Sequence, residues 1–231
     1  MAKRQVDIVQ ADRLRDQIYS LVKADIREGA LRLGKKLTEI DVAERYGISR
    51  TPVREALCQL TNEGLLVESK KGYALPIHSA EEIRERLELR ALIDPALLRH
   101  ACEDRTTQQL KALMSYLDEE KASVDEPDSR RFIAANTKFR DCILEMCGNK
   151  LLAQCSQLYD DQFQCFRDWG MQYPKHRHFV TVVHEQLCTA IWNRDSAMAK
   201  KTALGLIKHI ESLLEEYEES LVRDFHLKRK K

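Results

Sequence analysis

Apolar residues recur at three- and four-residue intervals along most of the chain, which is the pattern of helices that bury one face. In the first third, this pattern predicts a long helix near residues 11–29 and two short helices after it. From Ser79 onward, glycine and proline become scarce and helical periodicity takes over. We expect six helices there, near residues 80–103, 107–123, 128–147, 150–169, 176–193 and 196–223. The predicted fold class is mainly α, with these six helices in an antiparallel bundle.

The two short helices carry start and stop signals. Thr38 can cap the first of them, and Asp41 completes a capping box. Gly47 ends that helix. Ser49 is expected to accept a hydrogen bond from the backbone at the start of the second helix, where Pro52 is tolerated because first-turn amides lack intrahelical partners. The sequence therefore predicts a helix, a tight turn and a second helix.

The second short helix has one apolar and one polar face. The apolar positions form its buried stripe: Val53, Ala56, Leu57 and Leu60. Arg50, Thr51 and Arg54 lie on another face. Such a helix can enter the major groove of DNA, where arginine bonds the two acceptors of guanine and threonine touches a base or a phosphate. The alternative is a solvated arginine face, which any surface helix can carry.

A basic hairpin is expected directly after this helix. Residues 65–67 form a short apolar strand, Lys70, Lys71 and Gly72 make a basic turn, and residues 73–76 return as a second strand. The two lysines would meet phosphates or the minor groove, which adds affinity with little sequence preference. A solvated hairpin tip is the alternative. Together with the preceding helices, the hairpin completes a winged helix-turn-helix that binds DNA.

Composition agrees with a globular chain in two parts. The 231 residues are 43% hydrophobic, and the formal net charge of +1 combines a slightly basic first third with a slightly acidic remainder. No apolar run approaches the roughly 20 residues that span a bilayer, and the amino terminus lacks a secretory pattern. We therefore expect a cytoplasmic protein without a membrane partner. The seven scattered cysteines include no CxxC pair and indicate buried thiols rather than disulfides.

A set of residues in the first third resembles the winged helix of the GntR family: Gly34, Leu37, Ala43, Gly47, the run Ser-Arg-Thr-Pro-Val-Arg-Glu-Ala-Leu at 49–57, Leu60, Glu63-Gly64-Leu65 and Gly72. The resemblance covers residues 11–77, and the remainder resembles the FCD effector domain of the FadR-like subgroup. It implies that residues 1–78 are the DNA-binding domain and residues 79–231 an all-helical domain for effector binding and dimerisation. The DNA-binding set is Ser49, Arg50, Thr51, Arg54, Lys70, Lys71 and Gly72. Ile40 departs from the family, because many relatives have a DNA-contacting arginine there.

The resemblance also concerns a metal site. Relatives commonly bind a divalent metal through an aspartate and three histidines, beginning with an Asp-x-x-Phe-His segment. This chain has Asn136 and Arg140 in place of the first aspartate and histidine, His184 at the next ligand, and Leu206 at the last, with His209 about one turn farther on. An amide is a poor substitute for a carboxylate, and a guanidinium cannot coordinate a metal. We expect no cofactor; a divalent metal held by Asn136, His184 and His209 is the alternative.

Arg140 is instead expected to hold an anionic effector directly. It could also pair with Asp141 or Glu145. Asn136 and His184 would orient the ligand or serve as polar groups of the core, and Arg90, which matches a recurrent arginine of the family, would line the pocket or brace the domain interface. The effector-binding set is Arg90, Asn136, Arg140, His184 and His209.

The resulting hypothesis is a ligand-responsive transcriptional regulator, a repressor that binds a palindromic operator as a homodimer and responds to a small organic acid. No arrangement of nucleophile, base and orienting group is evident, so an enzyme is not expected. The pattern at His176, Arg177 and His178, after Pro174, indicates a solvated helix start rather than a metal cluster. Metal-dependent sensing, an enzyme with an appended winged helix, and a nucleoid protein without an effector are the alternatives.

Overall fold

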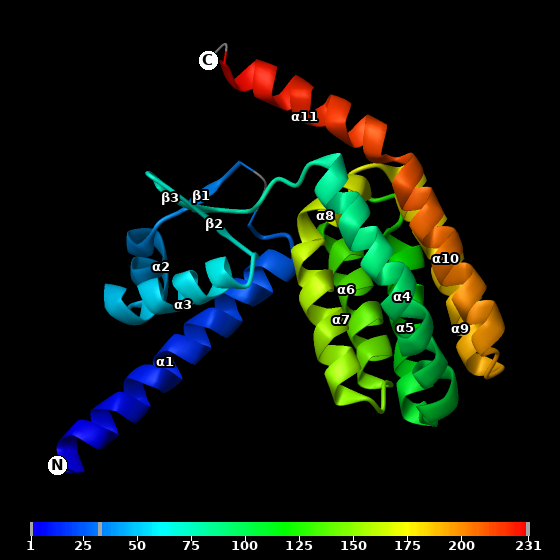
Figure 1. The fold of residues 1–231 in the computed structure, drawn as a ribbon, viewed down its shortest axis with the longest axis horizontal. Helices are drawn as coiled ribbons and strands as arrows, with labels where there is room; N and C mark the ends of the chain where they lie inside the picture. Colours follow the sequence, from blue (N-terminus) through cyan, green and yellow to red (C-terminus); the bar gives the residue numbers. More distant parts are fainter. Residues whose placement is uncertain (1, 32–33, 230–231) are drawn as a thin grey trace. The chain divides into compact units, whose positions relative to one another are not determined.

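The computed structural model of the chain describes residues 2–31 and 34–229, with side chains placed for 14–31 and 34–223. The chain divides into two compact units, Met1–Ile77 and His78–Lys231 (Figure 1). Each unit has its own buried core, and each is described by itself below.

The first unit combines three helices with a small antiparallel sheet. Its elements are α1 (Ala2–Arg27), β1 (Lys36–Leu37), α2 (Glu39–Tyr46), α3 (Arg50–Asn62), β2 (Val67–Ser69) and β3 (Gly72–Ala74). The strand order is β1-β3-β2, and Tyr73 of β3 lies between Leu37 and Glu68. The apolar side of α1, with Ile18, Val22 and Ile26 buried, packs against α3. This is the helix-turn-helix with a wing that the sequence predicts.

The cap of α2 is confirmed, whereas the predicted cap of α3 is wrong. Thr38 and Asp41 form a capping box, and Gly47 ends α2 in the left-handed conformation with φ of 65°. Ser49 has the extended backbone of an N-cap, but its side chain accepts no capping hydrogen bond. Pro52 explains this difference, because it occupies the third helical position and has no N–H to donate.

The wing begins later than predicted. Leu65 and Leu66 are buried, and their amides donate to the carbonyl oxygen of Leu60 at 2.9 and 3.3 Å, so they close the end of α3 instead of pairing as a strand. The hairpin strand therefore starts at Val67. β1 was not predicted, because two residues are too few to show a pattern.

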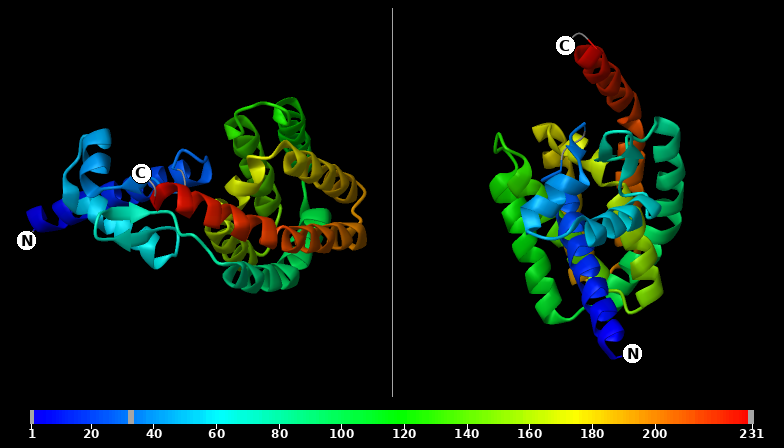
Figure 2. Two further views of the ribbon diagram at one scale, coloured as in Figure 1. Left: turned by 90° about the horizontal axis from the view of Figure 1, so that it is seen from above. Right: turned by 90° about the vertical axis from the view of Figure 1, so that its left-hand side faces the viewer.

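The second unit is all-helical. Its elements are α4 (Ala80–Asp104), α5 (Thr107–Ser123), α6 (Arg130–Glu145), α7 (Lys150–Gln162), α8 (Gln164–Met171), α9 (Pro174–Trp192), α10 (Ser196–Ser212) and α11 (Leu214–Arg229). Within the bundle α4 packs against α7 and α10, and α5 packs against α6 and α9, while α11 extends from the end of α10 (Figures 1 and 2). The all-helical fold of this unit and most of its helix positions agree with those predicted from the sequence.

Two of the six predicted helices are each divided in two. The helix expected over 150–169 breaks at Phe163, and the one expected over 196–223 breaks at Leu213. Neither place has glycine or proline as a signal. Phe163 and Leu214 are buried in the same cluster, together with Phe166, so long-range packing produces bends that local sequence does not announce.

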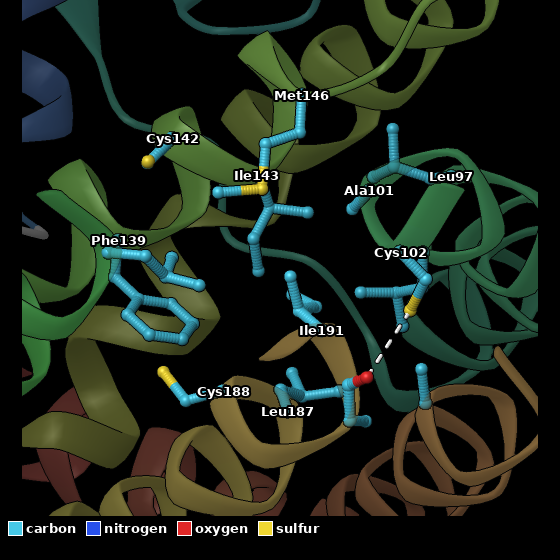
Figure 3. Close-up of a cluster of buried hydrophobic side chains, with 14 of the residues drawn as sticks. Leu97, Ala101, Cys102, Phe139, Cys142, Ile143, Met146, Leu187, Cys188 and Ile191 are labelled. Atoms are coloured by element: carbon cyan, nitrogen blue, oxygen red, sulfur yellow. Dashed lines mark hydrogen bonds between the residues drawn. The ribbon is translucent and has the colours of Figure 1, made fainter. Parts of the chain in front are cut away.

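Two large apolar clusters and a smaller one around Phe132, Ile133, Met171 and Val180 lie in the described part of the second unit. The central one joins α4, α5, α6, α9 and α10, and Figure 3 shows Phe139, Ile143, Leu187 and Ile191 facing one another within it. The other large one gathers aromatic rings around α8 and the start of α11. Burial raises the pKa of several thiols in the core, that of Cys142 to about 11, which agrees with a structural role.

Candidate DNA-reading surface and effector cavity

The exposed face of α3 carries the predicted DNA-reading residues. Arg50, Thr51 and Arg54 are exposed, as is Ser49 just before the helix. The opposite side is fully buried at Val53, Ala56, Leu57 and Leu60. Because the buried side fixes the rotation of α3, the two arginines and the threonine remain available to a partner.

Arg50 is held by the preceding helix. Its Nη2 donates to Oε2 of Glu39 at 2.8 Å, while 64% of the Arg50 side chain remains exposed. A guanidinium has five N–H donors, so this pair leaves donors free for a base or a phosphate. Glu39 was not singled out from the sequence, since an exposed glutamate near a helix start has an ordinary capping role. Next to it, Ile40 is half exposed and offers an apolar side chain at this edge.

The wing tip presents Lys70 and Lys71 to solvent. Ser69 stabilises the turn, because its hydroxyl donates to the carbonyl oxygen of Gly72 at 2.9 Å. Gly72 has φ of 109°, and a Cβ there would lie 2.6 Å from the carbonyl oxygen of Leu37. The close approach of β1 thus requires glycine at this position. A DNA contact by Gly72 stays a prediction.

Two adjoining cavities lie in the second unit, with about 610 and 570 Å³ of empty space, part of it open to solvent. Arg90, Arg140, His184 and Leu206 line both. We call the cavity that also contains Asp94, Ser156 and Asp160 the first cavity, and the one that also contains Asn136, Arg167, His176 and His209 the second cavity. All five residues predicted for effector binding line the second cavity.

Arg140 faces a carboxylate that the sequence did not indicate. It forms an ion pair with Asp160 on α7, not with Asp141 or Glu145 as the alternative predicted. Asp160 also contacts Arg167 on α8, with 3.2 Å between its Oδ2 and Arg167 Nη1. Two guanidinium groups thus share one carboxylate. The sequence around Arg140 could not indicate Asp160 as its partner, because Asp160 is twenty positions away and on another helix.

Arg90 extends the basic lining. Its guanidinium pairs with Asp94 one turn along α4, with 2.9 Å between Nη2 and Oδ2. It also lies over the ring of Phe163 at 5.5 Å from the centroid. These contacts hold Arg90 at the boundary between the cavities, which fits the pocket-lining alternative.

A buried carboxylate fixes the positions of Asn136 and His184. Glu120 is fully buried; Asn136 Nδ2 donates to its Oε1 at 3.1 Å, and His184 Nδ1 lies 2.9 Å from its Oε2. His184 also stacks on Phe139, with ring centroids 3.9 Å apart. Asn136 and His184 are therefore bonded core groups as well as cavity-lining ones. The sequence did not single out Glu120, because a glutamate in a helix usually lies on the surface.

The positions that correspond to the family's metal ligands do not fit a metal ion. Asn136 turns its amide nitrogen to Glu120, Arg140 is a cation, Leu206 has no donor atom, and one nitrogen of His184 faces Glu120. Within residues 2–31 and 34–229, no group of three or more His, Cys, Asp or Glu is placed to hold one. A guanidinium donates hydrogen bonds and cannot coordinate a metal, so this set lacks the ligands of its relatives.

His176 and His209 form a pair on the wall of the second cavity, with ring centroids 6.1 Å apart. Burial is the main cause that lowers the pKa of both imidazoles. The expected solvated helix start is wrong for His176 and Arg177, which are 6% and 1% exposed. Arg177 donates to the backbone oxygens of Val124, Glu126 and Met171, which ties the start of α9 to the α5–α6 loop.

Comparisons with known proteins agree with this architecture. The FCD domain model matches residues 85–212, and the model of bacterial regulatory proteins of the gntR family matches residues 14–74. The HTH-type transcriptional repressor RspR of Escherichia coli (strain K12) is 25% identical over 200 residues, 86% of this chain and of that protein. The uncharacterized HTH-type regulator YdhC of Bacillus subtilis (strain 168) is 22% identical over 210 residues, 88% of this chain and 94% of that protein.

A solved structure of E. coli McbR/YncC has the same fold, with a TM-score of 0.75 and 22% identity over 89% of this chain and 98% of that one. The matched families and relatives are regulators of transcription rather than enzymes. In the part of the chain that the structure describes, no helix is long and apolar enough to span a membrane. The chain belongs to the GntR family of transcriptional regulators, with a winged helix-turn-helix followed by an FCD domain.

Proposed function

We propose that this regulator is a repressor that binds a palindromic operator as a homodimer and leaves it when a small anionic organic acid enters the FCD domain. One observation carries the effector part: Arg90, Arg140 and Arg167 line the second cavity, whereas the carboxylates that pair with them, Asp94 and Asp160, line only the first. Such a cavity favours a ligand that supplies negative charge. The relative RspR is named a transcriptional repressor, which supports the direction of control.

DNA binding would use α3 in the major groove and the wing beside it. Arg54 and Arg50 read bases, Thr51 contacts a base or a phosphate, and Lys70 and Lys71 add phosphate contacts. Two copies related by a two-fold axis would read two half-sites. This function places the protein with the chromosome in the cytoplasm.

The effector would act through the ion pair of Arg140. A ligand carboxylate competes with Asp160 for this guanidinium, and Asp160 lies near the end of α7, just before the bend at Phe163. Because Asp160 also contacts Arg167 on α8, its displacement would change how α7 and α8 meet. Ligand binding then favours one arrangement of the dimer over another, and operator DNA favours the opposite one.

The first experiment is native mass spectrometry with metal analysis, followed by thermal unfolding in the presence of linear mono- and dicarboxylic acids. We expect a metal-free dimer that one or more of these acids stabilise, and we expect Arg140→Ala to lose this stabilisation. Arg130→Ala is the matched control, since Arg130 lies on the same helix and its side chain is 67% exposed. Stoichiometric bound metal, or stabilisation that survives Arg140→Ala, would contradict the proposal.

A further inference from the structure

The second cavity has two polar regions of different chemistry. One consists of the guanidinium groups of Arg90, Arg140 and Arg167, which favour an anion. The other is the pair His176 and His209. The remaining lining is mostly apolar and aromatic: Phe163, Phe166, Gly170, Met171, Val180, Leu206, Ile210 and Leu213. A ligand that fills the cavity must match both polar regions and this apolar wall.

Shielded polar atoms of this lining that have no hydrogen-bond partner within the described residues include Asn136 Oδ1, His176 Nε2 and His209 Nε2. Asn136 and His176 are only 2% and 6% exposed. A buried polar atom without a partner is costly, so such atoms are rare unless a ligand or water satisfies them. Since Asn136 gives its amide hydrogens to Glu120, its oxygen is left to accept from the cavity.

The histidine pair distinguishes between classes of ligand. Both imidazoles have a lowered pKa because they are buried, so the neutral ring is favoured. A neutral imidazole has one donor and one acceptor nitrogen. The two rings lie edge to face with centroids 6.1 Å apart, so their unpaired nitrogens belong to one small region of the wall. A hydroxyl group there can accept from one ring and donate to the other. A second carboxylate could also accept one N–H from each neutral ring, but burying its full charge there costs more than burying a hydroxyl, because neither neutral ring supplies a counter-charge.

We infer that the second cavity recognises a hydroxy monocarboxylic acid with an apolar body, whose carboxylate faces the arginines and whose distal hydroxyl bridges His176 and His209. The inference rests on the proposed function, because it names the class of the effector. Phe179 holds His209 in place by stacking at 3.6 Å between ring centroids. The hydroxyl subsite is thus preformed rather than assembled by the ligand.

The test compares matched acids by calorimetry on the full-length protein at pH 8. One series is 4-hydroxyphenylacetate, phenylacetate and 4-carboxyphenylacetate; the other is 6-hydroxyhexanoate, hexanoate and adipate. In at least one series the hydroxy acid should bind about tenfold more tightly than both analogues. His209→Phe and His176→Phe should remove this preference while the unsubstituted acid still binds. His178→Phe is the control, because His178 is exposed and pairs with Asp125 at 2.7 Å.

The outcomes separate the two claims. Equal binding of all three acids in each series, lost in Arg140→Ala, would overturn the hydroxyl subsite and leave the anion-sensing proposal intact. Tighter binding of the dicarboxylate, or a preference that survives both histidine variants, would also overturn the subsite. If Arg140→Ala still binds the hydroxy acid with the same preference, the subsite is supported and the proposed role of Arg140 is contradicted. If no acid binds, both claims fail.

Discussion

The two units use arginine in opposite settings. On α3, Arg50 is 64% exposed and pairs with the partly exposed Glu39, whereas in the FCD domain Arg140 is 18% exposed and pairs with Asp160, which is 12% exposed. An exposed pair is screened by water and exchanges partners at low cost, but a buried pair fixes its partners strongly. The difference indicates a surface that can exchange its contacts for phosphates and bases, and a cavity in which an incoming anion must compete with a built-in carboxylate.

The largest expected effect follows from removing the shielded carboxylate of Asp160, whose side chain is 12% exposed. Asp160→Ala leaves the guanidinium groups of Arg140 and Arg167 without their shared counter-charge. We expect a loss of about 3–5 kcal/mol in the free energy of unfolding, measured with urea. A stabilising organic acid should reduce this loss by replacing the missing charge. A change below 1 kcal/mol would show that Asp160 does not compensate these arginines.

The next largest effect concerns the DNA-reading face. Arg54→Ala should weaken operator binding by about 1–3 kcal/mol and relax base preference, as expected for a lost base contact. Anisotropy titrations with operator and random duplexes measure both effects, and Glu55→Ala, exposed beside it, is the control. Equal losses on operator and random DNA would refute base reading and leave only a phosphate contact.

Removing the partner of Arg50 should have a smaller effect. Glu39→Ala breaks the pair with Arg50, yet we expect the free energy of unfolding to change by no more than about 1 kcal/mol, since 64% of the Arg50 side chain is exposed and water screens its charge. Operator affinity should stay equal or rise as Arg50 is released. Destabilisation as large as that of Asp160→Ala would show that the two ion pairs do not differ in their contribution to stability.

The smallest expected effect is a pH dependence of stability. The pKa values of His176 and His209 are lowered by burial, so the folded protein binds fewer protons than the unfolded chain, and stability falls as pH drops below the ordinary imidazole value of 6.5. The decline ends near the lowered pKa of the folded state. Between pH 8 and 5, the melting temperature of the wild type should fall more than that of His209→Phe. Identical pH profiles would show that His209 is not shielded.

The DNA-reading face was predictable, because its signals are local. The capping box of Thr38, the turn at Gly47 and the spacing of Arg50 and Arg54 lie within a few turns of one another, and the structure presents both arginines as expected. Two local predictions differ from the structure: the cap at Ser49, because Pro52 has no N–H to donate, and the start of the wing, because Leu65 and Leu66 close the end of α3.

The cavity was predictable only in part. The positions of Asn136, Arg140 and His184 followed from the resemblance, but their partners Glu120 and Asp160 did not, because helix packing joins residues far apart in sequence. For the same reason, the bends around α8 and the burial of His176 had no sequence signal. Long-range packing therefore decides the chemistry of this site.

The most direct test of the account is operator affinity with and without a stabilising acid, for the wild type and for Arg140→Ala. We predict that the acid weakens operator binding by the wild type about 5- to 150-fold, the usual range of coupling between sites, and has no effect on Arg140→Ala. An acid effect of the same size in both proteins, or none in either, would contradict control through Arg140.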